Sequence, residues 1–232
     1  MALKDDLSSA VAKILQDLWS TEPGRVVPEP EDLGLGNDAT TLDAAVLYAD
    51  LSGSTNMVDT VPTYQAAEFY KCYMECAARI IKNAGGSVTA YDGDRIMGIF
   101  IGDQKNSTAA RTALEINWAR FYVINPAIRR RYGPGAYQLN HVVGIDSSNL
   151  FACRIGVRND NDLVWVGRAA NYAAKLSAIS EDNTTFITAE VFDRMLDTSK
   201  YGGDPYRLMW KQRQWTQMAH QRIYSSTWTW SL

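Results

Sequence analysis

The stretch AVLYADLSGST, residues 45–55, decides the fold that the sequence predicts. Its apolar run ends in Asp50 and passes straight into a Gly/Ser turn, which is typical of a buried strand followed by the start of a helix. Residues 62–84 then follow the pattern of a long helix, which Gly85 and Gly86 close. We therefore expect a strand, a turn and a helix in this order, with Asp50 at the end of the strand.

A pair of strands is expected directly after this helix. Residues 87–91 and 94–102 favour strands, and Asp92-Gly93 between them is a strong hairpin signal. The segments expected after the hairpin are a helix over 105–125 that Pro126 limits, strands over 137–146, 149–157 and 163–166, a helix over 168–178, a strand over 184–188, a short helix over 189–196, and one or two closing strands in the aromatic-rich tail. This order predicts an α+β class with a ferredoxin-like βαββαβ core, extra strands, and helices on one face of the sheet.

The first 41 residues follow a different pattern. Apolar residues recur at steps of three and four over residues 2–19, which predicts an amphipathic helix. Residues 20–41 contain three prolines and three glycines and indicate a linker or a draped arm. We expect residues 1–41 to form a helix and linker arm, with the helix as a candidate dimer contact. Residues 42–232 then form one domain.

Composition narrows the classes of protein. The 232 residues are 46% hydrophobic and 21% charged, with a net charge of -3, which excludes wholesale disorder and a general attraction to nucleic acid or anionic lipid. The sequence has no uncharged apolar run near 18 residues and no signal-peptide pattern, and its three cysteines are sparse. These features predict a soluble cytoplasmic protein without nucleic-acid or membrane partners. The absence of a P-loop, a GxGxxG motif and a Gly-x-Ser-x-Gly elbow argues against an ATPase, a dinucleotide enzyme and a serine hydrolase.

Two acidic residues are the strongest candidates for chemistry. Asp50 ends the first strand and Asp94 starts the second strand of the hairpin, so both carboxylates can meet at one sheet edge. Two like charges this close are costly unless a cation lies between them, and hard divalent cations prefer oxygen ligands. The turn after Asp50 also offers backbone N–H groups to a phosphate. The pattern indicates metal–nucleotide chemistry; the alternative is that Asp50 caps the next helix and Asp94 belongs to the turn.

Three separated motifs resemble the class III nucleotide cyclases. In that family the first strand ends in an aspartate followed by x-x-Gly-x-Thr, which Asp50, Gly53 and Thr55 match. The family hairpin carries Gly-Asp, matched here by Gly93 and Asp94. The resemblance spans roughly residues 42–195, with the motifs in the family's order and spacing.

The third motif matches in part. The later helix of the family begins Gly-x-x-x-Asn, which Gly167 and Asn171 match, but Lys175 stands where the family has an arginine. A lysine keeps the charge and loses the planar fork of the guanidinium. Arg168 and Arg154 are candidates to supply the missing guanidinium.

The resemblance implies a two-metal cyclase. Two divalent cations, Mn²⁺ or Mg²⁺, would be held by Asp50, Asp94 and the backbone carbonyl of Leu51, and the 3′-hydroxyl of a nucleoside triphosphate would attack its own α-phosphorus. The other residues that the resemblance implies are Ser52, Gly53, Ser54 and Thr55 as backbone donors to phosphate, Asn171 at the ribose, Lys175 at the α-phosphate, and Lys211 at the distal phosphates. The site would form between the two chains of a head-to-tail homodimer, with Asn171 and Lys175 from the partner.

Two positions bear on the base. Purine cyclases read adenine or guanine with polar side chains at the positions that Ala90 and Val164 occupy here. Neither can bond to a purine edge, which argues against adenine or guanine recognition in the usual manner. The sequence resembles more closely the bacterial pyrimidine cyclases of anti-phage defence, and this resemblance implies that cyclic UMP or cyclic CMP acts on a separate effector protein. We favour UTP because Arg95 or another donor can bond to the O4 atom of uracil. CTP and a purine triphosphate remain alternatives, as does a cyclase-like module that binds nucleotide without turnover.

The remaining polar and aromatic residues have simpler interpretations. Tyr48, Tyr91 and Trp165 are candidates to narrow the base pocket. His141 lies in an apolar segment and is expected to be a satisfied core histidine. The run Arg129-Arg130-Arg131 is interpreted as a solvated face after a helix, with phosphate binding as the alternative.

Overall fold

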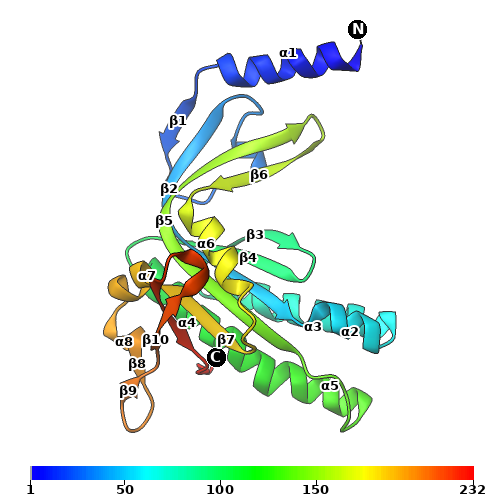
Figure 1. Cartoon of the computed structure of the whole chain (residues 1–232), viewed down its shortest axis with the longest axis vertical. Helices are drawn as coiled ribbons and strands as arrows, with labels where there is room; N and C mark the ends of the chain where they lie inside the picture. The colour runs from blue at the N-terminus through cyan, green and yellow to red at the C-terminus, as the bar shows by residue number, and fades with distance from the viewer. Residues whose placement is uncertain (1) are drawn as a thin grey trace.

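A mixed nine-stranded sheet organises the computed structural model, which describes residues 2–232 (Figure 1). Its central path runs β10-β11-β7-β5-β2-β4-β3, while β1 pairs with β2 and β6 pairs with β5. The strands of this sheet are β1 (Ser20–Pro23), β2 (Asp38–Ser52), β3 (Ser87–Asp92), β4 (Arg95–Ile101), β5 (Asn140–Val157), β6 (Asp160–Val166), β7 (Thr184–Thr188), β10 (Lys211–Trp215) and β11 (Gln221–Ser226). A separate two-stranded ribbon joins β8 (Tyr201–Gly202) to β9 (Arg207–Leu208).

The centre of the sheet has the predicted ferredoxin-like order. Along the chain, β2, α3 (Thr63–Asn83), β3, β4, α4 (Lys105–Ala119) and β5 form a βαββαβ unit, and in the sheet the four strands lie in the order β5-β2-β4-β3. The predicted α+β fold and the predicted β3–β4 hairpin are therefore confirmed. The other helical elements are α1 (Leu3–Gln16), α2 (Ser54–Thr60), α5 (Asn125–Tyr132), α6 (Arg168–Ser177), α7 (Ala189–Arg194), α8 (Asp197–Lys200) and the 3-10 turns η1 (Pro30–Asp32) and η3 (Thr216–Met218).

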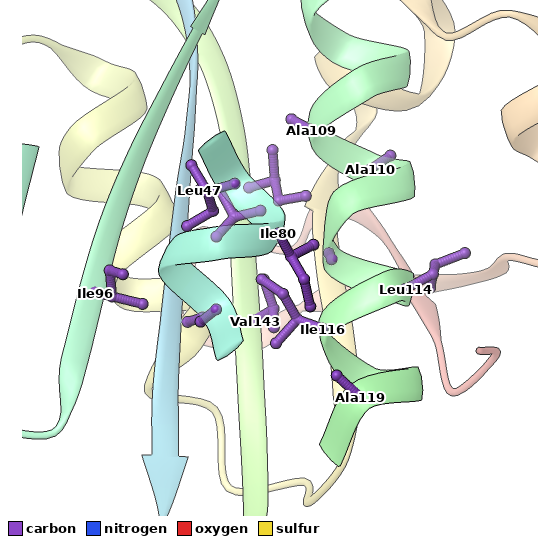
Figure 2. Close-up of a cluster of buried hydrophobic side chains, with 14 of the residues drawn as sticks. Leu47, Ile80, Ile96, Ala109, Ala110, Leu114, Ile116, Ala119 and Val143 are labelled. Atoms are coloured by element: carbon purple, nitrogen blue, oxygen red, sulfur yellow. The ribbon is translucent and has the colours of Figure 1, made fainter. Parts of the chain in front are cut away.

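The main core lies between the sheet and the helices α3 and α4. Alternate residues of the strands face this layer, so Leu47 of β2 and Val143 of β5 pack against Ile80 of α3 and Ile116 of α4 (Figure 2). The helix α3 ends at a Schellman motif: Gly86 N–H donates to the Ile81 carbonyl at 2.9 Å, and Gly85 has a φ of +81° that favours glycine.

The opposite face of the sheet carries α6, which corrects the expectation that all helices cover one face. The alanines of α6, such as Ala169 and Ala173, pack against Val46 of β2 in a second core cluster. This helix approaches so closely that a Cβ at Gly144 of β5 would lie 2.1 Å from the Ala173 carbonyl oxygen. The small residues on both sides let the helix backbone lie directly on the strand.

Two predicted breaks in the second half of the fold are absent within residues 2–232. The π-helical turn η2 (Arg120–Ile124) continues α4, and Pro126 lies in the first turn of α5, where its missing N–H is not needed. The predicted pair of strands over 137–157 is the single strand β5, because Ser147 and Ser148 continue the ladder with β2. The Ser148 hydroxyl also accepts a hydrogen bond from Ala169 N–H at 3.0 Å and so caps α6.

The N-terminal segment is more ordered than its prolines and glycines predict. Strand β1 pairs in parallel with the first residues of β2, which begins at Asp38. The predicted first helix is present as α1, and none of its side chains is buried; Figure 1 shows it standing off from the sheet at the N-terminal end. Within residues 2–232, no helix has the length and apolar character needed to cross a membrane.

Candidate active site

The end of β2 and the turn of the β3–β4 hairpin lie side by side. Leu51 N–H donates a hydrogen bond to the Asp94 carbonyl at 3.1 Å, and Asp50 is paired in register with Arg95. Asp94 lies in the turn itself, one residue before β4, and the turn is tight because Gly93 adopts a φ of +60°. The fold thus brings the two predicted aspartates to one sheet edge.

The charge on Asp50 is not compensated. Burial, followed by the nearby Asp94 carboxylate, raises the pKa of Asp50 from 3.8 to about 7, although Arg95 acts in the opposite direction. No group within residues 2–232 donates a hydrogen bond to this carboxylate, and Arg95 is paired with Asp92 at 2.7 Å. A cation at this edge would relieve the repulsion.

The donor set at this edge fits a hard divalent cation. Across residues 2–232, no three His, Cys, Asp or Glu side chains gather in a metal-binding cluster. The chain would therefore offer the Asp50 and Asp94 carboxylates and the Leu51 carbonyl, all of them oxygen ligands. This small set leaves positions for water or phosphate oxygens, as Mg²⁺ commonly requires.

The turn after Asp50 is held in place from two sides. Gly53 takes a φ of +71° just before α2, and its carbonyl accepts a hydrogen bond from the Tyr137 hydroxyl at 3.2 Å. The Ser52 hydroxyl donates to the Asp182 carboxylate, which also accepts from the Asn140 amide at 3.0 Å. Ser54 and Thr55 then open α2. Residues 52–55 are thus positioned by segments far away in the sequence.

The residues predicted for ribose and α-phosphate lie on α6. Asn171 and Lys175 are one turn apart and exposed, on the helix surface opposite the buried alanines. Within residues 2–232, neither side chain bonds to Asp50 or Asp94, and the Lys175 ammonium lies 3.7 Å from the Met218 sulfur. The two predicted groups of site residues are thus not joined within one chain.

Neither candidate arginine is free to replace the guanidinium that Lys175 lacks. Arg168 is paired with the buried Asp146 at 2.9 Å and with Glu190 at 3.3 Å. Arg154 donates to the Asn161 side chain at 2.7 Å and to the Leu33 carbonyl at 3.2 Å. Lys175 is therefore the cationic side chain of α6 that has no ion pair within residues 2–232.

The positions predicted to read the base lie on two different hairpins. Ala90 follows a bulge in β3 and Val164 lies on β6, and both are half-buried. Trp165 is buried in the second core cluster, and its role beside the base stays a prediction. Tyr48 is half-buried and Tyr91 is exposed.

The distal-phosphate candidate and its neighbour lie on the far side of the sheet. Lys211 is exposed on the outer strand β10. Arg213 of the same strand is paired with Glu181 at 2.7 Å. Of these two basic residues in the tail, Lys211 is the one without an ion pair within residues 2–232.

The polar groups behind the site were not predicted to be part of it. His141 lies opposite Leu51 in the β2–β5 ladder, and its Nδ1 atom bonds to the Tyr73 hydroxyl at 2.8 Å. Complete burial lowers the pKa of His141 to about 3, so the ring is neutral, and its Nε2 atom is buried without a partner in residues 2–232. His141 is thus a core histidine, as expected, but only one of its two ring nitrogens has a hydrogen-bond partner within residues 2–232. No local signal points to this pair, or to Asp182 beneath Ser52.

Comparison with known proteins identifies the family. The chain is 46% identical over 233 residues to the uridylate cyclase of Xanthomonas perforans and 47% identical over 234 residues to that of Burkholderia cepacia, in both cases over the full length of both chains. The chain belongs to the uridylate cyclase family. A further uridylate cyclase, from a Rhodovulum species, is 35% identical and aligns with 93% of this chain and 91% of its own. No family model matches the sequence.

Solved structures agree on the fold. The guanylyl cyclase Cya2 superposes with a TM-score of 0.69 over 82% of this chain and 94% of its own, at 16% identity. The adenylyl cyclase CyaB from P. aeruginosa gives 0.67 over 81% and 95%, at 18% identity. The chain therefore has the catalytic-domain fold of the class III cyclases, as its motifs predict. Its full-length relatives show that it is a nucleotide cyclase.

Proposed function

We propose that the chain converts UTP into 3′,5′-cyclic UMP and pyrophosphate. The observation that carries this proposal is the meeting of Asp50 and Asp94 at one sheet edge, where the Asp50 charge has no partner in the chain. The names of the full-length relatives support the same reaction. In the reaction, a bond forms between O3′ and the α-phosphorus, the bond to the bridging oxygen breaks, and the 3′-hydroxyl proton leaves to water.

Asp50, Asp94 and the Leu51 carbonyl would hold two divalent cations, Mg²⁺ or Mn²⁺. Such cations lower the pKa of the attacking hydroxyl and neutralise the triphosphate. The backbone N–H groups of residues 52–55 would bind phosphate oxygens. Their position depends on Asp182 and Tyr137, which hold Ser52 and Gly53 from outside the turn.

The proposed site is completed by a second copy of the chain. Asn171 and Lys175 are exposed on α6 and bond to neither aspartate in their own chain. In a head-to-tail homodimer, the partner's α6 would place its asparagine at the ribose and its lysine at the α-phosphate, and Lys211 would contact the distal phosphates. We further propose that residues 42–232 carry this chemistry and that residues 1–41 form an arm.

The base preference is argued from the side chains that are missing. Ala90 and Val164 cannot bond to a purine edge, and unmade hydrogen bonds weaken discrimination steeply. Arg95 is paired with Asp92, and that ion pair would have to open before Arg95 could bond to uracil. The choice of UTP over CTP therefore rests on the relatives. The product would act as a second messenger in anti-phage defence in the cytoplasm, through a separate effector, as the resemblance to pyrimidine cyclases suggests.

The deciding experiment is to incubate the purified protein with Mn²⁺ and each of ATP, GTP, CTP and UTP, and to identify the products by mass. Cyclic UMP and pyrophosphate from UTP alone is the expected result. Cyclic CMP or a cyclic purine would keep the cyclase and overturn the base assignment.

A second candidate is a module that binds nucleotide without turnover. Lys175 in place of the family arginine is the observation that favours it. Saturable UTP binding without product from any triphosphate would support this candidate, and appearance of activity in Lys175→Arg would locate the defect.

A further inference from the structure

A cavity lined by arginines opens where α4 passes through the π-helical turn η2 into α5. Its volume is about 470 Å³, and none of its lining residues belongs to the proposed active site. This volume lies within the range of about 300–1,000 Å³ that pockets for small ligands occupy. The lining residues that the argument uses are Arg120, Phe121, Tyr122, Asn125, Arg129 and Arg130.

Arg120 is a buried cation without a carboxylate partner. Arg120 is only 7% exposed, and no Asp or Glu within residues 2–232 lies within ion-pair distance of its guanidinium. Its Nε atom donates to the Asn117 side chain at 3.2 Å and Nη1 donates to the Leu139 carbonyl at 3.2 Å. Its Nη2 atom makes no hydrogen bond in the same residues, and Arg120 is one of the residues that line the cavity. A buried charge left in this way is costly unless an anion meets it.

Two further guanidiniums line the same cavity. Arg129 and Arg130 are exposed on α5, and no carboxylate within residues 2–232 pairs with either. No acidic side chain lines the cavity. Three guanidiniums around one hollow match a phosphate group, which each can contact with two parallel hydrogen bonds. This favours the phosphate alternative over the solvated face for two of the three arginines in the run.

Two aromatic side chains also line the cavity. Phe121 and Tyr122 are 53% and 54% exposed, with ring centroids 4.8 Å apart. Adjacent large rings in contact with each other and open to solvent offer a surface on which a flat ligand ring can pack. Asn125 does not compete for the ligand, because both ends of its amide are used by the Leu139 backbone. The cavity is thus lined by both guanidiniums and aromatic rings, and the Arg120 guanidinium lies 5.8 Å from the centre of the Phe121 ring.

We propose that this cavity binds a small phosphate ester that carries a flat ring. The phosphate would meet Arg120, Arg129 and Arg130, and the ring would pack on Phe121 and Tyr122. The binding is independent of the proposed cyclase chemistry, since no residue is shared between the two sites.

The test uses phenyl phosphate as the probe, titrated into the full chain by calorimetry in EDTA, so that a metal-dependent nucleotide site does not contribute. Saturable binding with one site per chain is expected. In the variant Arg129→Gln/Arg130→Gln the affinity should fall at least about tenfold, because two charge-assisted contacts are removed. Both residues are exposed, so the variant should fold; its circular dichroism and melting temperature check this.

Arg131→Gln is the matched control. Arg131 is the next residue on α5, but it does not line the cavity, and its guanidinium lies 5.3 Å from the Tyr132 ring. It should bind phenyl phosphate like the unchanged protein. The proposal is overturned if no saturable binding occurs up to about 10 mM probe, which is weaker than a specific site requires. It is also overturned if the double variant binds as tightly as the control.

Discussion

Asp50 and Asp146 lie on the same face of the sheet, on neighbouring strands, but their carboxylates differ in their hydrogen-bond partners. Asp146 is fully buried, and it accepts hydrogen bonds from Thr188 at 2.5 Å and from two nitrogens of Arg168 at 2.9 and 3.3 Å. Asp50 is only partly buried, yet no donor within residues 2–232 reaches it, and its pKa is raised to about 7. Burial alone therefore does not distinguish a structural acid from a functional one.

The difference lies in the partners. The fold surrounds Asp146 with a matched cation and a hydroxyl, so its charge stabilises the junction of β5, β7 and α6. At the end of β2, the fold instead places Asp94 beside Asp50 and so adds to the repulsion. Because two carboxylates repel each other there, a bound cation can stabilise the folded chain at this edge. The contrast makes Asp50 and Asp94 candidates for function and Asp146 a candidate for stability.

The largest expected effect is on turnover. Asp94→Asn should lower the rate of pyrophosphate release from UTP at least about a thousandfold, because several kcal/mol of charge stabilisation by metal would be lost. Circular dichroism should show an unchanged fold. Asp92→Asn is the matched control, since this acid lies in the same hairpin but is exposed and paired with Arg95. Equal losses in both variants would contradict the two-metal assignment.

The next effect is on stability. Asp146→Asn should lower the free energy of unfolding by about 3 kcal/mol, because a buried charge-assisted network loses its central acceptor. Urea unfolding measures the change. Asp193→Asn removes an Asp–Arg pair at the surface, in which the carboxylate lies 2.7 Å from Arg222, and should cost less than about 1 kcal/mol. If Asp146→Asn lowered the free energy of unfolding no more than Asp193→Asn, Asp146 would not be the structural acid that the comparison with Asp50 assumes.

The third prediction concerns acid stability and the neutral His141 behind the site. Its folded pKa of about 3 lies below the ordinary 6.5, so the unfolded chain binds more protons between these values and stability falls as the pH falls. Asp50 opposes this, since its raised pKa makes stability increase as the pH falls through 7. In metal-free Asp50→Asn protein the His141 effect is therefore exposed, and stability should drop by up to about 1.4 kcal/mol per pH unit below 6.5.

Two further variants test whether His141 causes this loss of stability in acid. Adding His141→Gln to Asp50→Asn should flatten the profile between pH 6.5 and 5, whereas adding His220→Gln should leave its slope in place. A slope that survives the loss of His141 would assign the acid sensitivity to another group. Urea unfolding at fixed pH steps provides the measurement.

The smallest effect has the opposite sign from the Asp146 variant. At pH 8 without metal, Asp50→Asn should raise the free energy of unfolding by about 1 kcal/mol, since it removes a charge that is partly desolvated and screened by solvent. Mn²⁺ should raise the melting temperature of the unchanged protein and leave that of the variant unaffected. Destabilisation by Asp50→Asn at pH 8 would show that the acid has a structural partner after all.

Much of the fold could be predicted because its signals are local. The apolar run before Asp50, the Asp92-Gly93 hairpin and the helix closed by Gly85-Gly86 depend on residues within a few positions of each other. The helix continues past Pro126 for a local reason that was not predicted: the π-helical turn puts the proline in the first turn of α5, where its missing N–H is not needed. The unbroken β5 could not be predicted from local signals, because β2 supplies the ladder at Ser147 and Ser148. The same holds for the site. The motifs predicted Asp50 and Asp94, but nothing in them indicated Asp182 or His141.

By itself, the sequence determined the order of the elements, the family resemblance, and which carboxylates and glycines lie in the motifs. These follow from chain geometry and side-chain type, which act over short stretches. Only the tertiary structure decided which acid is paired and which is left open, which arginines are already engaged, and that Arg120 lies buried beside a cavity. Charge compensation depends on residues such as Arg168 and Asp146, or Ser52 and Asp182, that are distant in the chain and meet only when it folds.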